Sequence, residues 1–287
     1  MTRAEHEALP ASWVDLESAS TLPSNDRAFY YGDSVFETMR YHNGEFLLLA
    51  RHLKRLALGC ETLGILHSSE QISHQLSLAV RHLKHAGIEQ ACARLTLTRG
   101  SGERGYAPAA NVPRLALTLT PVSLPWGESA APARVMTCSL RLALQPLLAG
   151  IKHGNRLEQV LAAREVADRG LDEGLLLDAT GQLVSAVSSN LFLLLDNGWV
   201  TPGINACGVR GTARDYLLDE VGMATGIAMT ARDIAYEELD RAEGLFICNS
   251  LQGIRAVSDV DGRAYPLHPQ ILALQSYWFE ALCEAGA

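Results

Sequence analysis

Lysine is scarce in this chain of 287 residues, which has three lysines, Lys54, Lys84 and Lys152, among many arginines. Arginine keeps its proton at any ordinary pH, whereas a desolvated lysine can lose one and act as a nucleophile or base. Lys54 and Lys84 stand beside other polar residues in helical patterns, which is typical of solvated faces. Lys152 follows the largely apolar run 147–151. The sequence therefore suggests a functional amine at Lys152, with an ordinary half-exposed lysine as the alternative.

Other features are absent, and each absence excludes a class of protein. The net charge of −8 argues against a general affinity for nucleic acid or anionic lipid. The apolar runs are too short to span a bilayer, and the first twenty residues lack the apolar core of a signal peptide. The six cysteines include no Cys-x-x-Cys pair, and the nine histidines show no metal-ligand spacing. We therefore expect a cytoplasmic protein with buried or idle thiols, no membrane span and no structural metal.

Hydrophobic periodicity predicts an α+β protein with two sheet-containing domains. The predicted helices span residues 51–63, 71–86, 155–169, 212–220 and 269–283. The predicted strands span residues 91–98, 115–120, 134–140, 175–177, 183–184, 191–195, 245–248 and 254–257. Asn155 and Glu158 fit a reciprocal cap at the start of the third helix. A proline-rich stretch near residue 125 predicts an N-terminal domain over 1–124, a linker over 125–133 and a larger C-terminal domain over 134–287 that carries Lys152.

The segment 150–160 resembles the cofactor-lysine segment of the fold-type-IV pyridoxal-phosphate enzymes, which include branched-chain and D-amino-acid aminotransferases. Further blocks match in the family's order. They are Asp26-Arg27, Tyr31-Gly32-Asp33, Phe36-Glu37-Thr38, His52 to Leu56, Arg99 to Tyr106, Ser189 to Phe192 and Cys248 to Leu251. One block is weak evidence, but seven in register are strong. The resemblance implies a two-domain fold, each domain built on a β-sheet or barrel with flanking helices, and a homodimer.

The resemblance also implies tasks for individual residues. Lys152 would bond covalently to the aldehyde of pyridoxal 5′-phosphate and later act as a base. Arg55 would bind the phosphate through its planar fork, and the turn before Thr212 would offer helix amides to the same group. The cofactor-binding residues implied are Lys152, Arg55, Ser185, Asn190, Thr212, Ala213 and Ser250. Without the resemblance, Arg55 reads as a surface arginine and Ser250 as a loop serine.

The glycine-rich loop 99–106 resembles that of the aminodeoxychorismate lyases more than that of the aminotransferases. Their substrate is a dicarboxylate, so its pocket needs cationic donors, and Arg99 and Arg104 are candidates. Tyr31 and Tyr106 complete the predicted substrate-binding set. Thr38 matches a hydroxyl near the reacting centre and would act as a proton relay. A solvated glycine loop and a buried β-branched threonine are the competing interpretations.

The sequence departs from the family at Ser185. Family members usually carry a glutamate there, which pairs with the protonated pyridine nitrogen and makes the ring a strong electron sink. A serine cannot form an ion pair, so transamination, which depends on the sink, should suffer most. The resemblance therefore favours a lyase that forms 4-aminobenzoate and pyruvate in folate biosynthesis. A D-amino-acid or branched-chain aminotransferase, and a cofactor-binding protein with little turnover, stay open.

Overall fold

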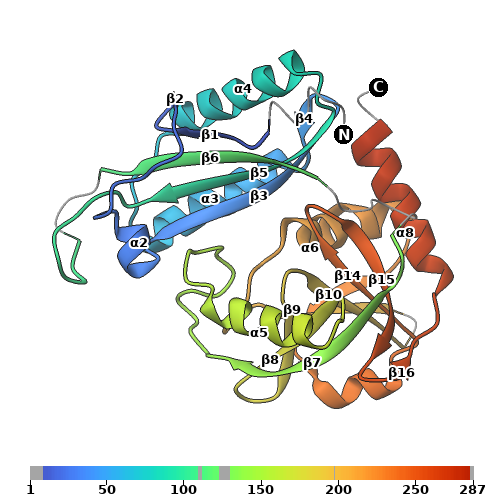
Figure 1. The fold of residues 1–287 in the computed structure, drawn as a ribbon. Helices are drawn as coiled ribbons and strands as arrows, with labels where there is room; N and C mark the ends of the chain where they lie inside the picture. The colour runs from blue at the N-terminus through green and yellow to red at the C-terminus, as the bar shows by residue number, and fades with distance from the viewer. Residues whose placement is uncertain (1–8, 109–111, 123–129, 197, 285–287) are drawn as a thin grey trace. The chain divides into compact units, whose positions relative to one another are not determined.

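The computed structural model describes residues 9–108, 112–122, 130–196 and 198–284 (Figure 1). The chain divides into two compact units, and the first combines Met1–Ser123 with Ile151–Asn155. The second combines Leu124–Gly150 with Arg156–Ala287. The Lys152 segment thus groups with the first unit, whereas the predicted boundaries put Lys152 in the C-terminal domain. Much of the predicted linker, residues 125–129, lies outside the described residues.

The first unit contains a six-stranded antiparallel sheet in the order β2-β1-β6-β5-β3-β4 (Figure 1). Its strands are β1 (Ala11–Val14), β2 (Glu17–Ser18), β3 (Ser34–His42), β4 (Glu45–Phe46), β5 (Gln90–Thr98) and β6 (Arg114–Pro121). Its helices are α2 (Arg27–Tyr31), α3 (Leu49–Leu63) and α4 (Ser69–His85). The predicted helices 51–63 and 71–86 correspond to α3 and α4, and Gly64 ends α3 in the left-handed conformation that favours glycine.

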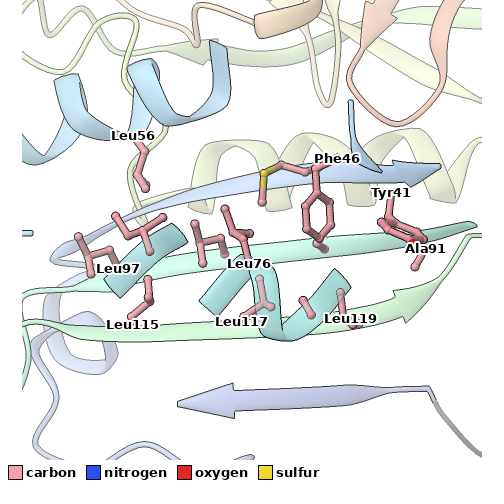
Figure 2. Close-up of a cluster of buried hydrophobic side chains, with 14 of the residues drawn as sticks. Tyr41, Phe46, Leu56, Leu76, Ala91, Leu97, Leu115, Leu117 and Leu119 are labelled. Atoms are coloured by element: carbon pink, nitrogen blue, oxygen red, sulfur yellow. The ribbon is translucent and has the colours of Figure 1, made fainter. Parts of the chain in front are cut away.

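One face of this sheet forms the core of the first unit. Alternate residues of the central strands are buried there, because successive side chains of a strand point to opposite faces. Figure 2 shows Leu97, Leu115, Leu117 and Leu119 on the strands, with Leu56 reaching toward them from α3. The residues in between lie on the other face, which we call the Thr38 face. The Thr38 face includes Phe36, Thr38 and Arg40 of β3, Cys92, Arg94 and Thr96 of β5, and Thr118 of β6.

The second unit contains a ten-stranded mixed sheet in the order β12-β11-β10-β14-β15-β7-β8-β9-β13, with β16 paired to β15 (Figure 1). Its strands are β7 (Ala133–Leu142), β8 (Glu173–Asp178), β9 (Gln182–Ala186), β10 (Asn190–Leu195), β11 (Gly198–Pro202), β12 (Met229–Arg232), β13 (Ile234–Ala235), β14 (Gly244–Asn249), β15 (Gly253–Val260) and β16 (Arg263–Ala264). Its α-helices are α5 (Leu157–Asp168), α6 (Thr212–Tyr216), α7 (Gly222–Thr225) and α8 (Pro269–Phe279). Single π turns (Leu217–Val221, Glu280–Glu284) and a 3-10 helix (Tyr236–Arg241) complete it. The predicted α+β class with two sheets is confirmed.

The predicted start of the third helix is wrong. Helix α5 begins at Leu157, its N-cap is Arg156, and no side-chain cap bond is made. The Glu158 carboxylate instead accepts a hydrogen bond from the Ala143 backbone amide at 2.9 Å. Asn155 belongs to the segment that groups with the first unit, so it lies before α5 and does not cap it.

The cysteines are unpaired thiols, and all but the half-buried Cys92 are buried. Burial raises the pKa of Cys60 to about 11 and that of Cys248 to about 12, so these thiols stay protonated and unreactive at neutral pH. Among the described helices, none combines the length and the apolar character that crossing a membrane requires.

The core of the first unit makes a prediction about stability. Leu117 is fully buried at the centre of the sheet, so Leu117→Ala should lower the free energy of unfolding by about 2–5 kcal/mol. Leu58 of α3 is 49% exposed, and Leu58→Ala should cost less than about 1 kcal/mol. Urea denaturation of both variants measures the difference. Equal losses would contradict the burial described for β6.

Candidate active site

Lys152 is held by backbone pairing to β3. The Phe36 amide donates to the Lys152 carbonyl at 2.9 Å, and the Gly154 amide donates to the Ser34 carbonyl at 2.8 Å. An antiparallel bridge joins Val35 to His153 between these bonds. The approach requires glycine, because a Cβ on Gly154 would lie 2.3 Å from the Ser34 hydroxyl oxygen. The segment therefore extends the sheet locally and fixes the backbone of Lys152.

The side chain of Lys152 is half-buried and lies on the Thr38 face. Its Nζ is 4.7 Å from the centroid of the Phe36 ring, and the guanidinium carbon of Arg94 is 3.8 Å from the same centroid. Thr38 is the next residue of β3 on this face and pairs across the sheet with Arg94. An amine and a guanidinium therefore flank one aromatic ring, with Thr38 on the same sheet face, a set that can move a proton and bind an anion.

Arg55 lies on the opposite face of β3, in a buried cluster with Glu37 and His52. Its Nε donates to one oxygen of Glu37 at 2.8 Å, and its Nη2 donates to the other. His52 Nδ1 lies 2.6 Å from the oxygen that Nη2 contacts. Both His52 and Arg55 come from α3, three residues apart, and so project from one side of the helix.

Burial and charge act in opposite directions on this cluster. Burial alone would raise the pKa of the Glu37 carboxyl, but the charge and hydrogen bonds of Arg55, with the hydrogen bond of His52, hold it below the ordinary 4.5. Burial lowers the pKa of His52 below its ordinary 6.5, although Glu37 opposes the shift. At neutral pH the cluster therefore contains a carboxylate, a guanidinium and an uncharged imidazole. The acceptor-only carboxylate requires the imidazole to carry its proton on Nδ1.

Hydrogen bonds from arginine side chains fix the predicted substrate-binding loop 99–106. Arg99 is buried; its Nε donates to Asp33 at 2.7 Å, and its Nη atoms donate to the carbonyls of Leu63 and Gly64 at the end of α3. Burial opposes ionisation of Asp33, but Arg99 and Arg27 hold the pKa of its carboxyl below the ordinary value. These contacts fix the guanidinium of Arg99 within the protein, and its predicted contact with substrate stays a prediction.

The other loop residues lie nearer the solvent. Arg104 and Tyr106 are exposed, and Tyr106 packs against Tyr31 with ring centroids 5.4 Å apart. The hydroxyl of Tyr31 accepts a hydrogen bond from the Gly105 amide at 3.1 Å, and Arg27 donates to the carbonyls of both Gly105 and Tyr106. The structure thus brings Tyr31 and the loop together, while the contact of Arg104 with substrate stays a prediction.

The second unit gathers several of the predicted cofactor residues. Asn190 donates from Nδ2 to the Val209 carbonyl at 3.1 Å, and a Cβ on Gly211 would lie 1.9 Å from its Oδ1. Asn190 therefore packs against the turn that opens α6, where Thr212 and Ala213 are buried. Ser250 follows Asn249, whose Nδ2 donates to the Ser189 hydroxyl at 3.1 Å. The roles of these residues toward a cofactor stay predictions.

Ser185 is buried on β9, where it pairs with Leu176 of β8. Strand β8 carries two buried carboxylates, Glu173 and Asp178, and Glu173 accepts hydrogen bonds from the Ser188 and Ser189 hydroxyls. Strand alternation places Glu173 on the face of Leu175 and Ser185 on the face of Leu176. Burial raises the pKa of Glu173, and the serines only partly offset this. Glu173 and Ser185 therefore lie on opposite faces of this part of the sheet.

Glu37, His52 and Arg94 are candidate functional residues that the sequence did not single out. Glu37 and His52 stand inside the blocks that carry the resemblance, but nothing in their spacing pairs them. Arg94 could have been found, because the alternation in 91–98 puts it on the face opposite the apolar residues Ala93 and Leu95.

Comparisons with known proteins identify the family of the chain. The family described as "Amino-transferase class IV" matches residues 34–260. The chain is 31% identical over 253 residues to an aminodeoxychorismate lyase of Vibrio harveyi, covering 86% of this chain and 90% of that protein. It is also 31% identical over 261 residues to a putative branched-chain-amino-acid aminotransferase of Methanocaldococcus jannaschii, covering 89% and 88%.

Among solved structures, the 4-amino-4-deoxychorismate lyase from Pseudomonas aeruginosa superposes with a TM-score of 0.86 at 40% identity. The match covers 94% of this chain and 98% of that chain. These likenesses confirm the resemblance predicted from the residue blocks.

The buried cluster makes the stability of the protein pH-dependent. The folded-state pKa values of His52 and Glu37 both lie below their ordinary values, so the unfolded chain binds more protons as the pH falls. The contribution of His52 is complete above about pH 6.5 and is lost below it, and that of Glu37 is lost below about pH 4.5. Each unit of lowering corresponds to about 1.4 kcal/mol.

We therefore expect His52→Asn to flatten the decline in unfolding free energy between pH 7.5 and pH 5, measured by urea denaturation at each pH. The exposed His85 provides the control, and His85→Asn should leave the wild-type slope unchanged. A slope that does not respond to His52→Asn would refute the shift assigned to this histidine.

Proposed function

The chain belongs to the amino-transferase class IV family, and we propose that within this family it is an aminodeoxychorismate lyase. Its cofactor is pyridoxal 5′-phosphate. The proposed reaction converts 4-amino-4-deoxychorismate to 4-aminobenzoate and pyruvate. The observation that carries the proposal is the half-buried amine of Lys152 on the same sheet face as Thr38 and Arg94. The likeness to two proteins named as this lyase supports it.

The first unit offers both groups that the cofactor needs, an amine and a guanidinium. The charge of Lys152 contributes to lowering the pKa of His52, so the amine lies within electrostatic range of the cluster that contains Arg55. The Lys152 amine, fixed by its backbone bonds to β3, suits the aldehyde, and the guanidinium of Arg55 suits the phosphate. When bound, pyridoxal phosphate withdraws electrons from the bonds next to the substrate nitrogen. Thr212, Ala213, Asn190 and Ser250 stay candidates for further cofactor contacts.

The residues of the Thr38 face have the chemistry that the elimination needs. The Lys152 amine would accept the proton from the substrate ring carbon next to the departing group. The Thr38 hydroxyl would hold a proton for the enolpyruvyl group as it leaves. The ring of Phe36, buried beneath both cations, would keep water away from the amine.

Arg94 is the best candidate for a partner of the substrate carboxylates. It lies next to Thr38 across the sheet, whereas the guanidinium of Arg99 is taken up by Asp33 and by the carbonyls at the end of α3. Burial lowers the pKa of Arg94, which nonetheless stays fully protonated near neutral pH. We therefore assign the carboxylate contact to Arg94, with Arg104 as a second candidate.

Two alternatives follow from specific observations. The likeness to the Methanocaldococcus jannaschii protein favours an aminotransferase, while Ser185 argues against one because the pyridine nitrogen lacks its carboxylate. Ser185 also motivates a cofactor-binding protein with little turnover. The resemblance further implies a cytoplasmic homodimer with residues of both chains near each site, which light scattering of the purified protein would test.

The central prediction concerns turnover. Purified protein with pyridoxal phosphate and 4-amino-4-deoxychorismate should release 4-aminobenzoate and pyruvate in equal amounts. Lys152→Ala should abolish this, with a loss of at least about a thousandfold, because it removes both the covalent anchor and the base. Chromatography of 4-aminobenzoate measures the product, and Lys54→Ala on the surface of α3 is the control.

Other outcomes would direct the assignment elsewhere. Pyruvate formed from D-alanine with 2-oxoglutarate, without 4-aminobenzoate from the lyase substrate, would identify an aminotransferase. Cofactor binding without either reaction, together with activity gained by Ser185→Glu, would identify a binding protein that has lost turnover.

Arg94→Gln should raise the KM for the dicarboxylate and lower kcat/KM by about ten- to a hundredfold, because a charge-assisted hydrogen bond is lost. Steady-state kinetics of 4-aminobenzoate formation measure the change. Arg81 of α4 is exposed, and Arg81→Gln should leave kcat/KM within about twofold of wild type. An unchanged KM in Arg94→Gln would move the carboxylate contact to another cation, with Arg104 tested next.

A further inference from the structure

Charged groups are buried between β3 and α3. Glu37 and His52 are fully buried, and the side chain of Arg55 is 10% exposed. Burying an ion pair costs desolvation, which its attraction must first offset, so the pair is weak evidence for a gain in stability over apolar residues of similar volume. Apolar residues would fill the same space beneath α3 at no such cost. The charges therefore call for a task other than stability.

The hydrogen bonds orient the guanidinium. Glu37 receives both Nε and one Nη2 hydrogen of Arg55, which is the side-on, two-point arrangement of an arginine–carboxylate pair. The plane of the fork is thereby fixed. The edge formed by Nη1 and the second Nη2 hydrogen is directed away from Glu37, with the geometry that two oxygens of a phosphate match.

His52 in turn orients the carboxylate. Its Nδ1 donates at 2.6 Å to the same Glu37 oxygen that Nη2 of Arg55 contacts. Because the imidazole is uncharged at neutral pH, it restrains Glu37 without adding a second positive charge that would compete with Arg55 for it.

The same strand also fixes Lys152. Phe36, adjacent to Glu37, donates its amide to the Lys152 carbonyl, while the Glu37 side chain points to the opposite face. Of these two consecutive residues of β3, Phe36 thus holds the segment that carries the Lys152 amine, and Glu37 holds the guanidinium of Arg55. A displacement of β3 would move both groups together.

We propose that Glu37 and His52 are positioning residues that orient the guanidinium of Arg55 toward the phosphate of the cofactor. Through them the protein distinguishes the phosphorylated cofactor from its unphosphorylated form, pyridoxal. The inference rests on the proposed role of Arg55 as a phosphate ligand. It goes beyond that role by naming the two residues that make the arginine effective.

The test compares two probes that differ only in the phosphate. Dissociation constants of pyridoxal 5′-phosphate and of pyridoxal are measured by equilibrium dialysis with the full-length chain stripped of cofactor. Glu37→Gln and His52→Leu should each weaken pyridoxal 5′-phosphate about tenfold or more, and leave pyridoxal within about twofold. His52→Asn, which keeps a donor near the Nδ1 position, should restore most of the lost affinity. Glu61→Gln, exposed on the same helix, is the matched control.

The pyridoxal arm separates positioning from a merely structural role. Equal weakening of both probes, or no weakening of either, overturns the proposal. If Glu37→Gln does not fold, Glu37→Asp keeps the buried charge but withdraws the carboxylate by one methylene, and the same selective loss is expected. Arg55→Gln distinguishes the two levels of the argument. If Arg55→Gln leaves the ratio of the pyridoxal and pyridoxal 5′-phosphate dissociation constants unchanged, Arg55 is not a phosphate ligand. If Arg55→Gln changes this ratio but the Glu37 and His52 variants do not, only the positioning role of Glu37 and His52 fails.

Discussion

The backbone pairing between residues 151–155 and β3 is the constraint on which the rest of the site depends. A lysine on a free loop would sample many positions, and its amine would stay in water. Here the segment is held at both ends of a bridge, by Phe36 and by Ser34, so the position of the Lys152 backbone follows from the sheet itself. Gly154 makes this possible, because any side chain there would collide with Ser34.

Strand alternation then separates two kinds of chemistry on β3. Glu37 points toward α3 and meets a guanidinium in a buried, fixed arrangement. Phe36 and Thr38 point to the other face, where Lys152 and Arg94 share an aromatic ring. A nine-residue strand can hold both sets because it is paired to β5 along its whole length. A loop carrying the same residues could not keep the groups in fixed relative positions.

The sequence predicted elements that have clear periodicity or a continuous apolar run, and it missed others, among them β3. Helices α3 and α4 follow from apolar stripes and terminal glycines, and β5 follows from clean alternation. Strand β3 is nearly buried on both faces and carries Glu37 and Arg40 inside, so its sequence has no period-2 signal. The start of α5 was misplaced because Asn155 has the residue type of a cap, while its segment is bound to the first unit.

The residues of the site likewise divide into those that the sequence predicted and those that it missed. Lys152 could be singled out because its residue type is rare and its surroundings resemble a known segment. Arg99 also stands in a motif that resembles the family. Its guanidinium, however, donates to carbonyls at the end of α3, and no local sequence pattern predicts where that helix ends relative to Arg99. The pairing of Glu37 with His52 and Arg55 joins positions 15 and 18 residues apart, through the packing of a helix on a sheet.

Ser185 bears on how far the reaction can differ between members of one family that share a fold. An aminotransferase must hold a carbanion on the cofactor ring long enough to reprotonate it elsewhere, and a carboxylate beside the pyridine nitrogen lowers the energy of that species. In the proposed elimination the electrons leave with the enolpyruvyl group, and the six-membered ring of the product becomes aromatic. The driving force therefore comes from the substrate, and the demand on the cofactor ring falls. A buried serine at this position is compatible with that reaction, whereas the role proposed for Lys152 calls for an amine.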